Sequence, residues 1–229
     1  MPRANWLAEL PTGRLIAEYS MWSADLIRLA DDLARIEGHA DILHIDVADG
    51  HFAPALLFFP DLVARLRGAT DTPIHVHLMV ADAVLVDQAA QFADAGADLI
   101  SIHVENAAVA DEALDLIRGR GLAAGVVLRV ETPVANCRRY LDRVDFLTLL
   151  GTAIGVKGQG LDPAAGDRLR QAGGLIRDSG RRIVLAADGG IRDNTVPVLR
   201  AAGAETVVMG SLAFGADDLA ARMRWLHAL

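Results

Sequence analysis

Eight short runs of apolar, largely β-branched residues recur along the chain, and longer helix-like segments separate them. Several runs are apolar on both faces, which is typical of parallel strands covered by helices on both sides. The eight runs are Arg14–Tyr19, Asp41–Val47, Pro73–Met79, Asp98–Val104, Leu122–Val130, Asp145–Gly151, Arg182–Asp188 and Glu205–Gly210. Eight strand-and-helix units in 229 residues predict an α/β fold, a single (β/α)8 TIM barrel.

The segments between the runs have the apolar spacing of amphipathic helices. Ser23–Ile36 opens with a serine suited to cap a helix, and Ala83–Ala95 and Asp111–Arg118 follow the same pattern. An open doubly wound sheet is the rival fold, but no Gly-x-Gly-x-x-Gly follows the first run, which disfavours a dinucleotide-binding fold. We expect residues 1–229 to form one domain, in which residues 1–13 are an extension that covers the barrel bottom through Trp6 and Leu7.

Composition excludes several classes of function. The 22 Lys and Arg residues against 30 Asp and Glu give a net charge of -8, and no basic run offers a nucleic acid its phosphate contacts. No apolar stretch approaches the ~18 to 20 residues that a membrane span needs, and the N-terminus lacks the apolar run of a signal peptide. The single cysteine, Cys137, excludes an intramolecular disulfide framework and fits a reducing compartment. We therefore expect a cytoplasmic protein with neither a nucleic-acid nor a membrane partner.

Polar side chains gather at the ends of the predicted strands, where active sites of such barrels lie. His44 and Asp46 share one face of their strand, His75 and His77 share a face of the next, and Asp188 ends the seventh strand. Imidazole and carboxylate groups together suit Zn²⁺, Mn²⁺ or Fe²⁺. The alternative is a set of polar residues satisfied by hydrogen bonds inside the barrel mouth, although burying several ionisable groups without partners costs several kcal/mol each.

Glycine-bearing loops follow the last three predicted strands. They are the loop Gly151–Gly160, the pair Gly189-Gly190, and Gly210-Ser211 before a predicted helix. Barrel phosphate sites commonly use such loops, because glycine lets backbone N–H groups approach an anion closely. The same glycines could instead serve tight turns between strand and helix.

These features together resemble the ribulose-phosphate 3-epimerase family from about Ser20 to Phe214. The motifs that carry the resemblance are Ser20-Met21-Trp22-Ser23-Ala24-Asp25, His44 through Pro54, His77-Leu78-Met79, Ile100 through Glu105, Asp188-Gly189-Gly190, and Gly210 through Phe214.

The resemblance implies an isomerase of the pentose phosphate pathway that inverts C3 of a ketose phosphate such as ribulose 5-phosphate. One divalent metal ion would be held by His44, Asp46, His77 and Asp188. Asp46 and Asp188 would also act as the acid and base, on either side of an enediolate stabilised by the metal.

The resemblance also implies the residues that contact the sugar phosphate. These are Ser20, His77, Gly155, Val156, Lys157, Gly158, Gly189, Gly190, Gly210 and Ser211. Members of the family commonly form homodimers or hexamers, so a homo-oligomer is expected.

The chain departs from the family pattern around the substrate. The family has Met at Ala48, a smaller apolar residue at Trp22, Asp at His75 and Gly at Lys157. The change at Ala48 opens space that Trp22 could fill in part. Lys157 could bind phosphate, pair with a substrate carboxylate, or be a solvated loop lysine, whereas His75 could support the metal ligands or be a hydrogen-bonded core residue.

These departures leave other functions open. The substrate could be allulose 6-phosphate or a tetrulose phosphate rather than ribulose 5-phosphate, or the chain could be a non-catalytic barrel that binds a metal or phosphate. A related lyase or decarboxylase is disfavoured, because its Asp-x-Lys-x-x-Asp motif does not occur and Lys157 is the only lysine.

Overall fold

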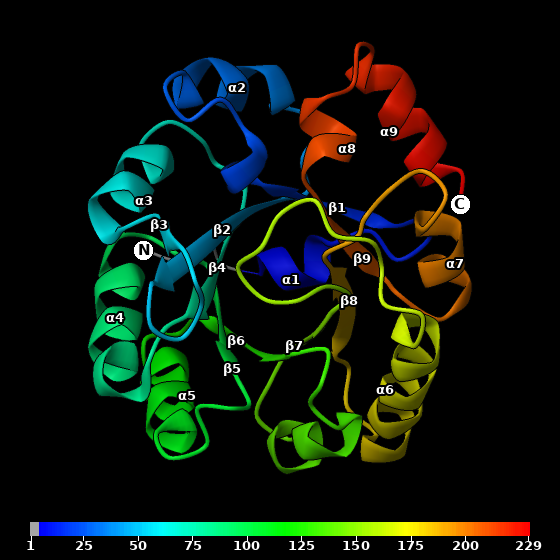
Figure 1. Ribbon diagram of the computed structural model, residues 1–229. Coiled ribbons are helices and arrows are strands. Elements are labelled where there is room, and N and C mark those ends of the chain that lie inside the picture. The colour runs from blue at the N-terminus through cyan, green and yellow to red at the C-terminus, as the bar shows by residue number, and fades with distance from the viewer. Residues whose placement is uncertain (1–4) are drawn as a thin grey trace.

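A closed barrel of eight parallel strands forms the centre of the molecule (Figure 1). The computed structural model describes residues 5–229. The barrel strands are β1 (Ile16–Ser20), β2 (Ile42–Asp49), β4 (Ile74–Met79), β5 (Leu99–His103), β6 (Ala123–Leu128), β7 (Phe146–Leu150), β8 (Val184–Asp188) and β9 (Thr206–Met209). They pair in the order β1-β9-β8-β7-β6-β5-β4-β2, and pairing of β2 with β1 closes the ring. The predicted TIM barrel is confirmed.

Helices surround the barrel and cover the outer faces of the strands (Figure 1). They are α2 (Leu29–Ile36), α3 (Pro60–Arg67), α4 (Asp82–Asp94), α5 (Ala110–Gly119), α6 (Ala165–Ser179), α7 (Val196–Ala201), α8 (Ser211–Phe214) and α9 (Leu219–His227), with 3-10 turns at η1 (Met21–Ser23) and η2 (Val134–Tyr140). Sequence analysis did not anticipate β3 (Leu56–Leu57), a short strand that pairs antiparallel with the end of β2.

The helix predicted to begin at Ser23 begins instead at Leu29, so its predicted start is wrong. The side chain of Asp25 accepts a hydrogen bond from the Ile27 amide at 3.1 Å, which holds the chain in a turn. Such local side-chain bonds compete with helix formation. Ile27 therefore remains 93% exposed, although its spacing matched the helical pattern.

An apolar layer closes the bottom of the barrel. Alternate residues of each strand point inward, and the lowest inward residues are Ile16, Ile42, Leu99, Ala123, Phe146 and Val184. The short helix α1 (Trp6–Glu9) places the buried Trp6 against this layer, 6.2 Å from the Phe146 ring, and Leu7 packs beside it. Trp6 and Leu7 therefore lie at the barrel bottom, residues 1–4 of the predicted extension lie outside the described part of the chain, and the opposite end is left for the polar residues.

Within residues 5–229, no helix is both long enough and apolar enough to cross a membrane.

Candidate active site

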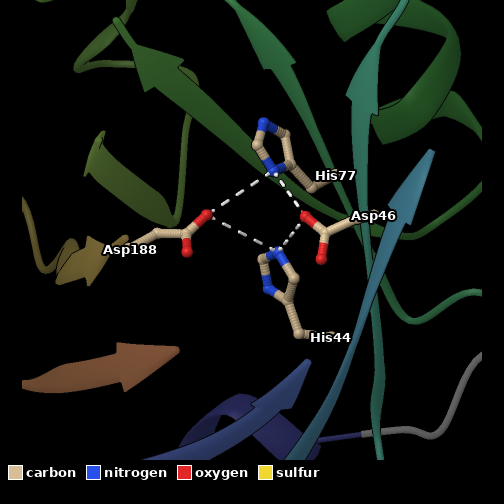
Figure 2. A group of neighbouring side chains, drawn as sticks. All are labelled: His44, Asp46, His77 and Asp188. Atoms are coloured by element: carbon tan, nitrogen blue, oxygen red, sulfur yellow. Dashed lines mark ion pairs between the residues drawn. The ribbon is translucent and has the colours of Figure 1, made fainter. Parts of the chain in front are cut away.

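Four polar side chains from three strands converge at the carboxyl ends of the strands (Figure 2). β2 supplies His44 and Asp46, β4 supplies His77, and β8 supplies Asp188 from across the barrel. The Oδ1 atom of Asp46 lies 3.3 Å from His44 Nε2 and 3.4 Å from His77 Nδ1, and the Oδ2 atom of Asp188 lies 4.0 and 3.8 Å from the same nitrogens. These are the four residues predicted from the sequence to be metal ligands, and the fold brings them together.

The chemistry of this cluster fits a divalent cation. His44 Nε2 and His77 Nδ1 are buried, and neither has a hydrogen-bond partner in the described part of the chain. One ligand atom from each of the four residues lies within 4.8 Å of all the others. Buried polar atoms are rarely left unsatisfied without a reason. Two imidazole nitrogens and two carboxylates facing one point make a donor set suited to Zn²⁺, Mn²⁺ or Fe²⁺.

The two carboxylates have different electrostatic environments. Burial alone would raise the pKa of Asp46, but the charge of the neighbouring His44 and His77 outweighs burial and holds that pKa far below its usual range. Burial raises the pKa of Asp188 to about 6, and the charge of Asp46 acts in the same direction. Ser20 Oγ also donates to Asp46 Oδ2 at 2.8 Å, whereas the Asp188 side chain is 17% exposed. Separated pKa values of this kind suit one carboxylate to accept a proton while the other holds one.

The outer nitrogen of each histidine is engaged by a buried partner. His77 Nε2 lies 2.9 Å from His103 Nε2, and His103 Nδ1 lies 3.0 Å from Glu105 Oε2. Since the carboxylate only accepts, His103 donates to it from Nδ1, and His77 donates from Nε2 to His103. This tautomer leaves the lone pair of His77 Nδ1 facing the cluster. On the other side, His44 Nδ1 lies 3.0 Å from Glu18 Oε2.

A cavity of about 300 Å³ opens above the cluster, within the size range of small-molecule sites. Asp46, His77 and Asp188 lie at its base, whereas His44 lies beneath them and is fully buried. The residues predicted to contact the sugar phosphate all line this cavity: Ser20, His77, Gly155, Val156, Lys157, Gly158, Gly189, Gly190, Gly210 and Ser211.

Two of the predicted phosphate glycines also have a purely structural reason. Gly189 and Gly190 adopt positive φ angles of 85° and 69°. A Cβ atom on Gly190 would lie 2.8 Å from the Leu161 backbone, and one on Gly189 would overlap Thr152. The turn alone thus requires glycine at both positions, which agrees with the alternative that these glycines serve a tight turn between strand and helix. The same two residues also line the cavity.

Trp22 and Lys157, two residues that depart from the family pattern, contact each other beside the cavity. Lys157 donates from Nζ to the backbone oxygen of Trp22 at 2.6 Å, and its ammonium lies 4.5 Å from the centre of the Trp22 ring. Lys157 is therefore anchored rather than freely solvated, and it ties the loop after β7 to η1. Ala48 packs with Ala53 and Met79 in a small apolar cluster.

Two charged residues beside the cluster were not named from the sequence as part of the site. Glu18 lies in the middle of β1 with no exposed surface, and its only signal was a lone acidic residue within an apolar run. Arg192 follows the Asp188-Gly189-Gly190 turn and lines the cavity. Its position two residues after Gly190 could have suggested a second positively charged side chain near a phosphate.

Comparison with known proteins agrees with this site. The model of the ribulose-phosphate 3 epimerase family matches residues 16–214. Ribulose-phosphate 3-epimerase 1 of Cupriavidus necator is 38% identical over 206 residues, covering 87% of this chain and 84% of that protein. Ribulose-phosphate 3-epimerase of Serratia marcescens is 38% identical over 203 residues, covering 87% and 95% of the two chains.

A solved structure of 3-hexulose-6-phosphate synthase shares the fold, with a TM-score of 0.64, 19% identity, and coverage of 93% of this chain and 99% of that one. At that identity the likeness concerns the barrel alone. The family match over most of the chain and the two relatives at 38% identity agree with each other and with the convergent His and Asp residues. The chain is a member of the ribulose-phosphate 3-epimerase family, a family of isomerases.

Proposed function

We propose that the protein epimerises a ketose phosphate at C3, with Asp46 and Asp188 as the two proton-transfer groups. The observation that carries this proposal is the placement of the two carboxylates on β2 and β8, with the free nitrogens of His44 and His77 between them. Inversion requires proton transfer on two faces of one carbon, and two carboxylates from separate sides of the barrel meet that requirement.

The reaction begins when one aspartate takes the proton from C3, beside the ketone, and it ends when the other returns a proton to the opposite face. Ser20 holds Asp46 in place through the 2.8 Å hydrogen bond to Oδ2. Asp188, whose pKa is the higher of the two in the cation-free protein, is assigned as the carboxylate that returns the proton.

The residues His44, Asp46, His77 and Asp188 would hold one divalent cation, whose identity among Zn²⁺, Mn²⁺ and Fe²⁺ stays a prediction. When bound, the cation supplies positive charge where the enediolate oxygens develop negative charge. The protein's own contribution is to present two unprotonated imidazole nitrogens and two carboxylates that are already in position.

The substrate is proposed to be D-ribulose 5-phosphate, as in the pentose phosphate pathway, with allulose 6-phosphate and a tetrulose phosphate as alternatives in that order. The relatives' names support the first of these. The phosphate is assigned to the cavity wall formed by Gly155–Gly158, Gly189-Gly190 and Gly210-Ser211, where Lys157 and Arg192 add positive charge. Cytoplasmic location and a homodimer or hexamer also stay predictions.

Proton NMR in D₂O tests the proposal. The protein, loaded in turn with Zn²⁺, Mn²⁺ and Fe²⁺, is mixed separately with each of the three ketose phosphates. Loss of the C3 proton signal together with appearance of the epimer is expected for at least one substrate. Tight metal binding without exchange on any ketose phosphate would refute the proposal and favour a non-catalytic metal-binding barrel.

A further inference from the structure

Glu18 is a charged residue inside the barrel, one layer below the candidate cation site. Its side chain has no exposed surface, and its Oε2 atom lies 3.0 Å from His44 Nδ1 and 2.8 Å from His75 Nδ1. Its Oε1 atom accepts a hydrogen bond from Thr206 Oγ1 at 3.0 Å. One carboxylate from β1 therefore joins strands β2, β4 and β9 across the interior.

The hydrogen bonds define which nitrogen of each histidine carries a proton. An ionised carboxylate only accepts, so both Nδ1 atoms donate to Glu18. The Nε2 atom of His75 then accepts from the Ser101 hydroxyl at 2.7 Å, which completes the bonding of that ring. Of the four ring nitrogens of His44 and His75, Nε2 of His44 is the one without a hydrogen-bond partner among residues 5–229, and it faces Asp46 and Asp188.

His75 occupies the position where the family pattern has aspartate. It pairs in register with His44 on the neighbouring strand, and the two rings lie 4.7 Å apart. The Nδ1 atoms of both rings share one oxygen of Glu18, so a carboxylate on either β1 or β4 could reach the same nitrogen of His44. The carboxylate beside His44 is thus supplied by Glu18 of β1 in this chain, whereas the family pattern would supply it from the His75 position of β4.

We propose that Glu18 is the positioning residue for His44: it fixes the Nδ1–H tautomer, so that the lone pair of Nε2 points at the cation site. This inference rests on the proposed function, because it assigns a role toward the cation of that site. Carboxylates that hold the outer nitrogen of a ligating histidine raise its basicity, and their loss commonly lowers metal affinity ~10- to 100-fold. His75 and Thr206 hold Glu18 in turn, and neither contacts the cation site directly.

The decisive variant is Glu18→Gln. An amide oxygen in the place of Oε2 can still accept from both imidazoles, but it carries no charge, so it is a weaker acceptor and holds the His44 Nδ1–H less firmly. Zn²⁺ affinity of the full-length, metal-stripped protein is measured by calorimetry against a competing chelator, with Glu112→Gln, an exposed glutamate of α5, as the matched control. We expect a ~10- to 100-fold loss for Glu18→Gln and no change for the control.

A spectroscopic signature separates positioning from packing. Long-range ¹H–¹⁵N correlation of the metal-free protein with ¹⁵N-histidine should show His44 protonated at Nδ1 in the wild type and a shifted Nδ1 resonance in Glu18→Gln. The double variant Glu18→Ala/His75→Asp, which moves the carboxylate to β4, should regain both the tautomer and the affinity to within a few-fold.

Each outcome bears on the proposal. Wild-type affinity and an unchanged His44 spectrum in Glu18→Gln would overturn it while leaving the epimerase assignment intact. A double variant that folds but binds Zn²⁺ no better than Glu18→Gln would overturn it, and so would failure of both to fold, because the buried charge would then be purely structural. Wild-type protein that binds no Zn²⁺ would overturn this inference and the proposed metal site together.

Discussion

Replacing Asp188 by Asn should make the metal-free protein more stable while it removes epimerase activity. Asp188 is mostly buried beside a second carboxylate, and burial raises its pKa from the ordinary value of 3.8 to about 6. The native state therefore binds this proton more tightly than the unfolded chain does. As the pH rises from about 4 to 6, the unfolded chain releases this proton, whereas the native state either retains it or holds a poorly solvated negative charge on Asp188. The native state therefore loses stability relative to the unfolded chain.

The magnitude follows from the two pKa values. Each pKa unit corresponds to about 1.4 kcal/mol, so the gap between 3.8 and about 6 costs the native state up to about 3 kcal/mol at pH 7. Asparagine has nearly the same shape and no charge. We therefore expect Asp188→Asn to raise the free energy of unfolding by up to about 3 kcal/mol at pH 7, and the melting temperature by about 6 to 12 °C for a chain of this size.

Urea and thermal unfolding in the presence of a chelator measure this effect at pH 7 and again near pH 4, where the difference should vanish. The matched control is Asp193→Asn, an exposed aspartate five residues away. In the metal-loaded state, epimerisation by Asp188→Asn should fall by ~10²- to 10⁴-fold, the usual contribution of a general acid or base. A variant no more stable than the wild type at pH 7, or one with full turnover, would refute the reasoning.

Three further predictions concern other parts of the molecule. Asp46→Asn should abolish inversion but still permit exchange of the C3 proton with D₂O from one epimer through Asp188, which NMR of each separate epimer would detect. Trp6→Ala should lower the free energy of unfolding by ~3 to 5 kcal/mol in urea while the KM stays unchanged, because Trp6 is 5% exposed and far from the cavity. Burial raises the pKa of the Cys137 thiol to about 11, so native protein should resist iodoacetamide at pH 8, and rapid alkylation without unfolding would contradict this.

The barrel was predictable from the sequence because its strands are local features. Each apolar run carries its own signal, and the alternation of inward and outward residues places His44 beside Asp46 without knowledge of the rest of the chain. The turn before α2 was less predictable. The Asp25 side chain accepts a hydrogen bond from the Ile27 amide and α2 begins only at Leu29, although the apolar spacing continues through Ile27. The missed strand β3 has only two residues, too few for a periodic signal.

The residues that support the site were harder to find, because their partners are distant in sequence. Glu18 meets His44 and His75 only after β1, β2 and β4 are in register, and nothing near Glu18 in the chain indicates that pairing. His103 and Glu105 belonged to a recognised motif, yet their contact with His77 depends on the pairing of β4 with β5. Spacing along one strand predicts which residues share a face, whereas contacts across the barrel require the register of several strands.

The two halves of the site are supported differently, and the difference bears on how the proton moves. Asp46 is held by Ser20 and lies near both imidazole nitrogens, so it stays ionised and fixed in position. Asp188 lies farther from both, is partly exposed and has the raised pKa, so it is the first of the two carboxylates to take up a proton as the pH falls in the cation-free protein. Since both carboxylates are positioned before substrate arrives, little reorganisation is needed when charge develops at C3, which is the condition for efficient electrostatic catalysis. Within the proposed mechanism, this asymmetry favours Asp46 as the base that takes the C3 proton and Asp188 as the donor that returns one.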